Sequence, residues 1–179
     1  MLDILYNRRT TRKFSGNKID EKTIHQLLMA ALLSPSSKNN QPWEFIVVDD
    51  AGLLSQLSTS KPHGACLLKY APLAIVVTGD KSRSDVWIED CSIASIMIQL
   101  AAEGLGLGSC WVQIHRRYYN DETTADEFIR ELLDIPNHLE VLSIVGIGHK
   151  SADRPILTEK VTDWGKVKRN NYHTLNNPE

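Results

Sequence analysis

The sequence feature that most restricts the fold is a long apolar segment from about Ser84 to Glu103. At helical spacing, one face of this segment carries Ile93, Met97, Leu100, Ala101 and Gly104. Three more isoleucines, at positions 88, 96 and 98, lie elsewhere around the same helix. A helix that is apolar on most sides is usually covered on most sides. We therefore expect this segment to be a central, buried helix.

The other elements alternate in type along the chain. Helices are expected at the N-terminus (Leu2, Leu5, Tyr6), after a capping Asp20, over "AGLLSQLS", and after the capping-box sequence Thr124–Glu127. Strands are expected over Glu44–Val48, Leu73–Gly79, "GLGLGSCWVQI" and "EVLSIVGIG". Roughly four strands and five helices in mixed order indicate a layered α/β sandwich.

Length and composition indicate one globular domain, residues 1–179, with a net charge of −2. That charge gives no reason to expect a nucleic acid or an anionic membrane as partner. No apolar run approaches the roughly 18 residues of a membrane-spanning helix, and the start of the chain does not resemble a signal peptide, so a cytoplasmic protein is expected. Cys66, Cys91 and Cys110 lack metal-site spacing and are expected to be buried thiols. The histidines also lack metal spacing, so no metal site is predicted.

The first candidate site is "RRTTRKF", at the end of the opening helix. Arg8, Arg9 and Arg12 bring guanidinium groups together with the hydroxyl of Thr10. Arginine binds phosphate with two parallel hydrogen bonds, so the segment is a candidate phosphate clamp. In an extended segment, Arg8, Thr10 and Arg12 would point to one side. The alternative is a solvated basic helix end that balances the helix dipole.

The second candidate is "SPSSKNNQPW", between a helix and a strand. Pro35 ends the helix, and Ser36, Ser37, Asn39 and Asn40 offer donors and acceptors. Either these groups bind a polar ligand, or they satisfy the backbone of an elaborate turn.

The third candidate is "GLGLGSCWVQ". Its glycines follow a helix and have GxGxG spacing, so a Rossmann dinucleotide fingerprint is rejected. Gly104, Gly106 and Gly108 are expected to end the helix and turn the chain into a strand, or else to let a flat ligand approach the backbone. No catalytic nucleophile or catalytic side chain is evident, which indicates that a cofactor performs any chemistry.

Together, "RRTTRKF", "SPSSKNNQPWEFIVV", "GLGLGSCW" and "IVGIGHK" resemble, in order and spacing, the nitroreductase family of flavoenzymes, particularly its shorter members. The resemblance runs from Leu2 to about Asn171. It implies an α+β fold, a three-layer α/β/α sandwich whose mostly antiparallel central sheet is completed by dimerisation. The C-terminal segment, about 150–179, is then expected to pack on the partner subunit of a homodimer.

The resemblance also implies FMN as the cofactor, bound at the dimer interface. Arg8, Arg9, Thr10 and Arg12 match the segment that holds its phosphate and ribityl chain, and Pro35, Ser36, Ser37 and Asn39 match the segment that reaches the flavin from the other subunit. Cys110, Trp111, Val112 and Gln113 match the stretch along the isoalloxazine ring, with a backbone N–H near Val112 or Gln113 facing flavin N5. Arg154 is the first choice for a basic C-terminal residue at the phosphate, with Lys160 and Lys166 as competitors. The stretch from His63 to Lys69 has no clear counterpart of the Asn and Lys near the flavin pyrimidine in larger members.

The implied function is an oxidoreductase that passes a hydride from NADH or NADPH through flavin N5 to a small acceptor, such as a nitroaromatic or quinone, by a ping-pong mechanism. Alternatives are a flavoenzyme of the same fold with other redox chemistry, or an FMN-binding protein with little turnover.

Overall fold

The computed structural model describes residues 2–152 and 162–174. Its centre is a four-stranded sheet in the order β1-β2-β4-β3, formed by β1 (Trp43–Val48), β2 (Leu73–Asp80), β4 (Leu139–His149) and β3 (Leu107–Gln113). All three strand pairs are antiparallel. The two central strands are buried along nearly their whole length, which matches their continuous apolar sequences.

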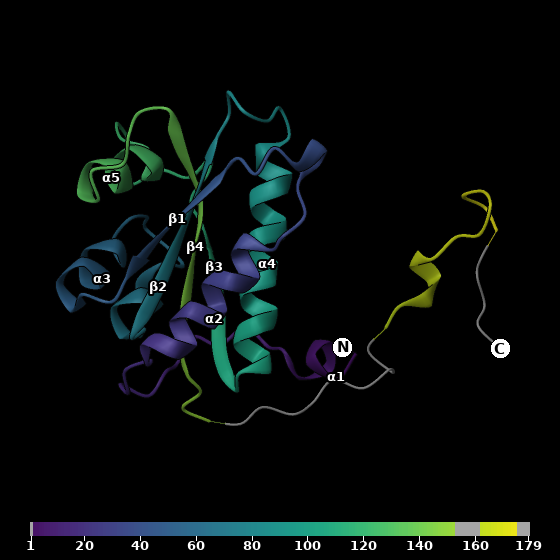
Figure 1. Ribbon diagram of the computed structural model, residues 1–179, viewed down its shortest axis with the longest axis horizontal. Coiled ribbons are helices and arrows are strands. Elements are labelled where there is room, and N and C mark those ends of the chain that lie inside the picture. The colour runs from purple at the N-terminus through teal and green to yellow at the C-terminus, as the bar shows by residue number, and fades with distance from the viewer. Residues whose placement is uncertain (1, 153–161, 175–179) are drawn as a thin grey trace.

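Helices cover both faces of the sheet, as Figure 1 shows. On one side lie α2 (Glu21–Leu32) and α4 (Trp87–Gly104). On the other lie α3 (Ala51–Leu57), the 3₁₀ helix η2 (Cys66–Tyr70) and α5 (Ala125–Leu132). Each face has its own cluster of buried side chains, centred on Ile98 and on Leu57 respectively. The predicted α+β fold with α/β/α layering is confirmed.

Local sequence explains where three helices begin. Asp20 accepts a hydrogen bond from the backbone N of Thr23 (3.0 Å), and Asp50 accepts one from Leu53 (2.8 Å). Thr124 and Glu127 form the predicted capping box, each side chain bonding the other's backbone N–H. Such caps satisfy N–H groups that the first helical turn leaves without partners.

The helix α4 is central as predicted, but it is covered on one side and not on most sides. Its covered face carries small and polar residues among the apolar ones: Cys91, Ala94, Ser95, Ile98 and Ala102. Ile93 and Ile96 of the same helix are 37% and 39% exposed. The short helix α1 (Leu2–Asn7) packs against the end of α4, where Ile4 lies beside Gly104. Leu2 and Leu5 are exposed too, so α1 and α4 leave apolar side chains uncovered in the single chain.

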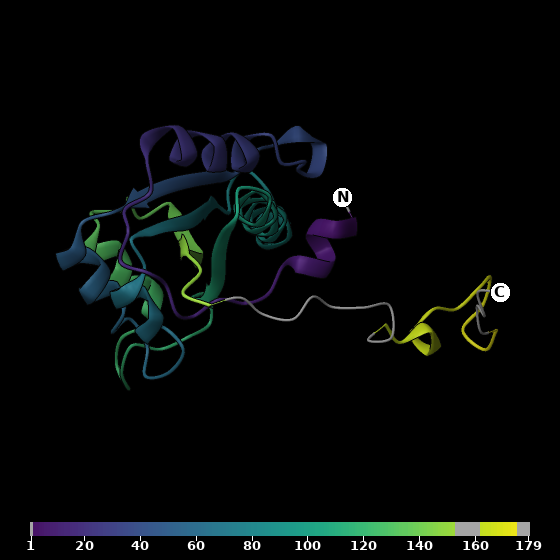
Figure 2. The same cartoon turned by 90° about the horizontal axis from the view of Figure 1, so that it is seen from below.

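The C-terminal segment stands apart from the sheet and its helices. Figures 1 and 2 show residues 162–174, with the 3₁₀ helix η4 (Trp164–Lys166), away from the body in both views. Trp164 and Tyr172 are 42% and 78% exposed. Among the described residues, no helix is long and apolar enough to cross a membrane.

The cysteine prediction is right for two residues and wrong for one. Cys91 and Cys110 are buried, whereas Cys66, at the start of η2, is exposed. All three are free thiols.

Candidate functional site

The arginine-rich segment runs beside the free edge of the sheet. The backbone N of Thr11 donates to the carbonyl of Ser109 on β3 (2.9 Å), and Thr10 forms a parallel bridge with the same residue. Thr11 is buried. Because neighbouring side chains of an extended segment point to opposite sides, Thr10 and Arg12 lie on the side away from Thr11. The predicted alternation therefore holds for Thr10 and Arg12, whereas Arg8 still bonds back to Ile4 in the last turn of α1.

Gly108 makes this close approach possible. A Cβ built on Gly108 would lie 2.6–2.7 Å from the side chain of Thr11. The space that a side chain at position 108 would fill is therefore taken by Thr11 of the arginine segment. One of the two sequence interpretations had placed a flat ligand against these glycines. Gly104 is the last residue of α4, and Gly106 has a φ of 76°, so these two glycines end the helix and turn the chain as expected.

The arginines of this segment have no acidic partner among the residues that the structure describes. Within the described ranges, none of Arg8, Arg9 and Arg12 forms an ion pair with a carboxylate. Arg8 and Arg9 are half-buried, and Arg12 is exposed but close enough to Cys110 to oppose the rise in the pKa of its thiol. Several guanidinium groups without carboxylates form a donor set that suits a phosphate. The residues present therefore fit the phosphate end of FMN.

The free edge of β3 offers backbone groups beside these arginines. The carbonyls of Ser109 and Gln113 both accept hydrogen bonds from outside the sheet. The N–H of Ile114, just after β3, instead donates to the carbonyl of Leu142 on β4. Since peptide groups of one strand alternate between its two edges, the N–H groups of Trp111 and Gln113 face outward and that of Val112 faces β4. Of the two N–H groups considered for flavin N5, the geometry favours Gln113.

The side chains of β3 alternate between the two faces of the sheet. Cys110 and Val112 are buried against the α3 and α5 side. Burial raises the pKa of the Cys110 thiol. On the other face, Trp111 Nε1 donates to Gln113 Oε1 (2.9 Å), and Gln113 Nε2 donates to the carbonyl of His115 (3.1 Å). These bonds fix the Gln113 amide, which leaves its backbone as the group free to contact a ligand.

Lys61 joins this edge from the turn after α3, and sequence reasoning missed it. Its Nζ donates to the carbonyl of Gln113 (2.7 Å). Desolvation lowers the pKa of Lys61, and the nearby Arg117 lowers it further. A lysine half-buried among other cations and paired only with a carbonyl is suited to an anionic ligand. The sequence offered no clear counterpart of the family's lysine around His63 to Lys69, and Lys61 lies just before that stretch.

The second candidate segment forms a tight loop with unusual backbone angles. Lys38, Asn39 and Gln41 have φ values of 49°, 56° and 46°. Residues other than glycine seldom adopt these angles, at a cost of about 1 kcal/mol each. Ser36 Oγ accepts a hydrogen bond from the backbone N of Gln41 (3.0 Å), so part of the polar run does serve its own turn. Pro35 lies exposed at the start of the loop.

The remaining polar side chains of the loop are available. Ser37, Asn39 and Asn40 make no side-chain hydrogen bond to any residue that the structure describes. The backbone N of Ser37 is held by Asp90, a buried carboxylate on α4, at 2.8 Å. Both sequence interpretations of this loop are therefore right in part. It satisfies some of its own groups and presents others outward.

The two candidate segments do not meet within one chain. The loop is tied to Asp90 at the start of α4, whereas α1, which leads into the arginines, packs against Gly104 at its end. Fourteen residues of α-helix separate these points by about 21 Å. Figure 1 shows the loop between α2 and β1 near one end of α4 and α1 near the other. A single ligand contacted by both segments would need two copies of the chain.

Two of the predicted C-terminal residues cannot be placed. Arg154 and Lys160 lie outside the described residues. Lys166, on η4, is exposed and lies 3.9 Å from the carboxylate of Asp163.

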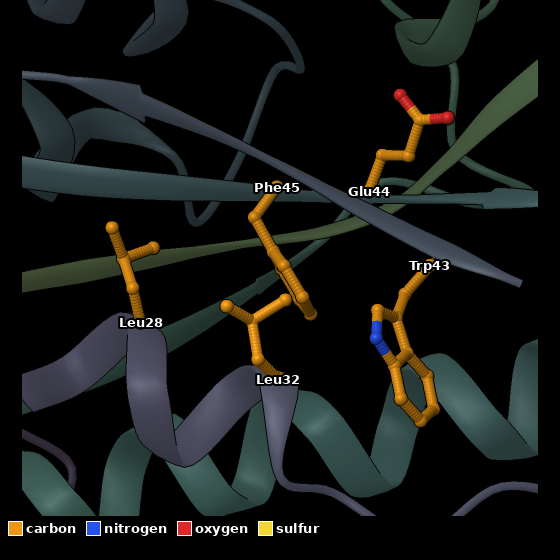
Figure 3. A pocket seen from close by; sticks show the side chains of 5 residues that line it. All are labelled: Leu28, Leu32, Trp43, Glu44 and Phe45. Atoms are coloured by element: carbon orange, nitrogen blue, oxygen red, sulfur yellow. The ribbon is translucent and has the colours of Figure 1, made fainter. Parts of the chain in front are cut away.

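An apolar groove lies between α2 and β1, the two elements that the loop connects. It is lined by Leu28 and Leu32 of α2 and by Trp43, Glu44 and Phe45 of β1, as Figure 3 shows. Leu28, Leu32 and Phe45 point toward one another there, beside the free edge of β1. Its apolar lining does not suit a phosphorylated cofactor.

Comparison with known proteins identifies the family. The profile of the Nitroreductase family matches residues 5–60 and 56–149. The structure is similar to that of an FMN-dependent nitroreductase from Clostridium difficile R20291, with a TM-score of 0.94, 45% identity, and coverage of 96% of this chain and 99% of the other. Among sequence relatives, a provisionally named NADH dehydrogenase/NAD(P)H nitroreductase of Archaeoglobus fulgidus is 38% identical over 86% of this chain and 87% of its own. An FMN reductase [NAD(P)H] of Bacillus subtilis is 25% identical over 89% and 70%. The chain belongs to the nitroreductase family.

Proposed function

We propose that the protein is an FMN-dependent oxidoreductase that uses NADH or NADPH to reduce a small acceptor such as a nitroaromatic or a quinone. When bound, FMN supplies the redox chemistry, because its N5 accepts a hydride from the nicotinamide and the pair of electrons then passes to the acceptor in ping-pong order. One observation carries the proposal. Arginines for which the described residues provide no carboxylate partner lie beside a strand edge whose N–H groups face outward.

The arginine segment would hold the phosphate of FMN. Arg8, Arg9 and Arg12 supply charged donors, and Thr10 adds a hydroxyl on the same side as Arg12. The hydrogen bond from Thr11 to Ser109 fixes this segment against β3 before any ligand arrives. A preformed clamp binds more tightly because less conformational entropy is lost on binding.

The edge of β3 and Lys61 would meet the flavin ring. The outward N–H of Gln113 would donate to N5 in the plane of the ring, which would position the ring without covering a face of it. Lys61, held at the carbonyl of Gln113, would place a positive charge near the pyrimidine, where negative charge accumulates on reduction. No side chain of the protein is needed as a general acid, since water can supply the proton.

The functional unit would be a homodimer. In each chain the loop Pro35–Asn39 is tied to Asp90, and the helix that leads into the arginine segment packs at Gly104, about 21 Å along α4. The loop of one copy would therefore complete the flavin site of the other. Ile93 and Ile96 of α4 leave an apolar surface between these segments for a second copy to cover. The exposed Trp164 of the C-terminal segment, about 150–179, would likewise pack on the partner.

The dimer can be tested by placing a charge on this surface. We expect Ile93→Glu to convert the protein to a monomer in sedimentation experiments and to lose FMN at the same time. Tyr70→Glu is the matched control, because Tyr70 is also exposed but lies on η2, on the other face of the sheet. A monomeric Ile93→Glu that still binds FMN as the wild type does would contradict the shared site.

The test of the proposed function is a spectrum followed by reduction. Purified protein is mixed with FMN and desalted, and the flavin absorption should stay with the protein. Under anaerobic conditions, NADH or NADPH should then bleach the flavin, and a nitroaromatic or quinone should restore it. Reduction without reaction with these acceptors would indicate another redox reaction. FMN retention without reduction would indicate a binding protein, and no retention would refute the proposal.

A further inference from the structure

A buried carboxylate on α4 links the loop Pro35–Asn39 to the core. Asp90 is only 2% exposed. Its Oδ1 accepts the backbone N–H of Ser37 (2.8 Å), and its Oδ2 accepts the hydroxyl of Ser84 (2.8 Å). Within the described part of the chain, no lysine, arginine or histidine forms an ion pair with it.

Burial of a carboxylate without a cationic partner costs free energy, so other contacts must stabilise Asp90 in this position. Asp90 lies in the first turn of α4, where the helix dipole favours a negative charge. The two hydrogen bonds satisfy both of its oxygens, and a bond to a charged acceptor is stronger than one between neutral groups. The bond from the Ser37 N–H to Asp90 is therefore the strongest hydrogen bond described for this loop.

The loop needs such an anchor because its backbone is strained. Lys38, Asn39 and Gln41 adopt left-handed angles immediately after the anchored residue. Strained conformations persist only where surrounding contacts hold them, and they are concentrated at functional sites. Three of the described contacts lie within the loop: Gln41 N to Ser36 Oγ, Asn39 N to the carbonyl of Ser36 (3.1 Å), and Asn40 N to the carbonyl of Ser37 (2.9 Å). The Ser37–Asp90 bond is the one described hydrogen bond that ties residues 36–41 to the body of the protein. Without Asp90, relaxed conformations of the loop become accessible.

We infer that Asp90 is a positioning residue for the flavin site. By fixing Ser37, it holds the loop in the conformation that presents Ser37 and Asn39 to the FMN of a second copy. This inference rests on the proposed function. Asp90 itself touches no ligand, since it is enclosed between α4, the loop and Ser84.

The experiment compares three variants of the full-length protein. Asp90→Ala removes both hydrogen bonds, and Asp90→Asn keeps an acceptor for Ser37 and offers a donor to Ser84, whose hydroxyl can then accept. Ser95→Ala is the control. Ser95 is equally buried on α4, but its hydroxyl bonds Cys91 and Ser143 toward the sheet, away from the loop.

Two readouts separate positioning from general stability. Hydrogen exchange of a peptide covering residues 34–43 should be at least about tenfold faster in Asp90→Ala than in the wild type, and close to wild type in Asp90→Asn and Ser95→Ala. The dissociation constant for FMN should rise about tenfold or more in Asp90→Ala only. Unchanged exchange in Asp90→Ala, or an equal loss of FMN affinity in Ser95→Ala, would overturn the inference. Failure of the proposed function would be visible separately, as absence of FMN binding by the wild type.

Discussion

Replacement of Gly108 by alanine is expected to displace the arginine segment from β3. The new Cβ would lie 2.6 Å from Cγ2, 2.7 Å from Cβ and 2.7 Å from Oγ1 of Thr11. Carbon atoms pack best at about 3.5–4.0 Å, so the pair would be about 1 Å too close. Thr11 cannot simply rotate away, because its own Cβ is part of the overlap and its backbone N is bonded to Ser109. The segment would have to move as a whole.

The expected magnitude follows from this overlap. Overpacking by one methyl group costs about 1–3 kcal/mol, which lowers the melting temperature of a chain of this size by about 2–12 °C. Arg12 follows Thr11 directly, so if the proposed phosphate clamp is right, Arg12 should lose at least one hydrogen bond to the phosphate. A charge-assisted hydrogen bond contributes about 1.5–3 kcal/mol, so FMN affinity should fall by about 10- to 100-fold.

The assay is thermal unfolding of the apoprotein together with titration of FMN fluorescence. Gly16→Ala is the control, since nothing lies within 4 Å of a Cβ at that position. Thr11→Gly should relieve the overlap. The double variant Gly108→Ala/Thr11→Gly should therefore lose less stability than the sum of the losses in the two single variants. If Gly108→Ala behaves like Gly16→Ala in both measurements, the packing argument is wrong.

Four other outcomes are expected. Ellman's reagent should label Cys66 rapidly and Cys91 hardly at all, because Cys66 is exposed while burial raises the pKa of Cys91 to about 12; equal rates would contradict this. Lys61→Met should weaken the binding of reduced FMN more than that of oxidised FMN. The midpoint potential of bound FMN, measured by dye equilibration, should fall by about 30 mV for each tenfold change in the ratio of the two dissociation constants. Thr124→Ala should destabilise the protein by about 1 kcal/mol in urea without changing FMN affinity. The pKa of Glu127 is lowered by its bonds to Thr124, so its contribution to stability is present above its ordinary value of 4.5 and is lost as the pH falls through the lowered pKa. Glu127→Gln should therefore weaken the acid-induced loss of stability, and an unchanged acid profile would refute this.

Local patterns in the sequence predicted most of the secondary structure. The capping box before α5 and the aspartate before α2 involve residues three apart, so both are visible in the sequence. The central helix shows the limit of such patterns. Its apolar residues lie on most sides, so periodicity could not indicate that the side with Ala94 and Ile98 faces the sheet while Ile93 faces outward.

Contacts between distant residues could not be predicted in the same way. Gly108 was expected to allow a turn or a flat ligand, whereas its role depends on Thr11, about a hundred residues earlier. Lys61 reaches Gln113 from a turn that has no motif of its own. Asp90 left no clear signal, because the sequence did not show which side of α4 is covered and its partner Ser37 is 53 residues away. The sequence therefore shows which segments form the candidate site, but the contacts between them are visible only in the three-dimensional structure.

The edge of β1 that faces away from β2 has a consequence for self-association. Within the described residues, the strand Trp43–Val48 has no neighbouring strand on that edge and lies beside an apolar groove, and such an edge is a template for uncontrolled sheet growth. Glu44 is exposed near the start of that strand. If two such edges met in the register that sets one Glu44 opposite the other, the like charges would oppose the pairing. Charged side chains on edge strands act in general as gatekeepers against aggregation, and Glu44 has the position for that role.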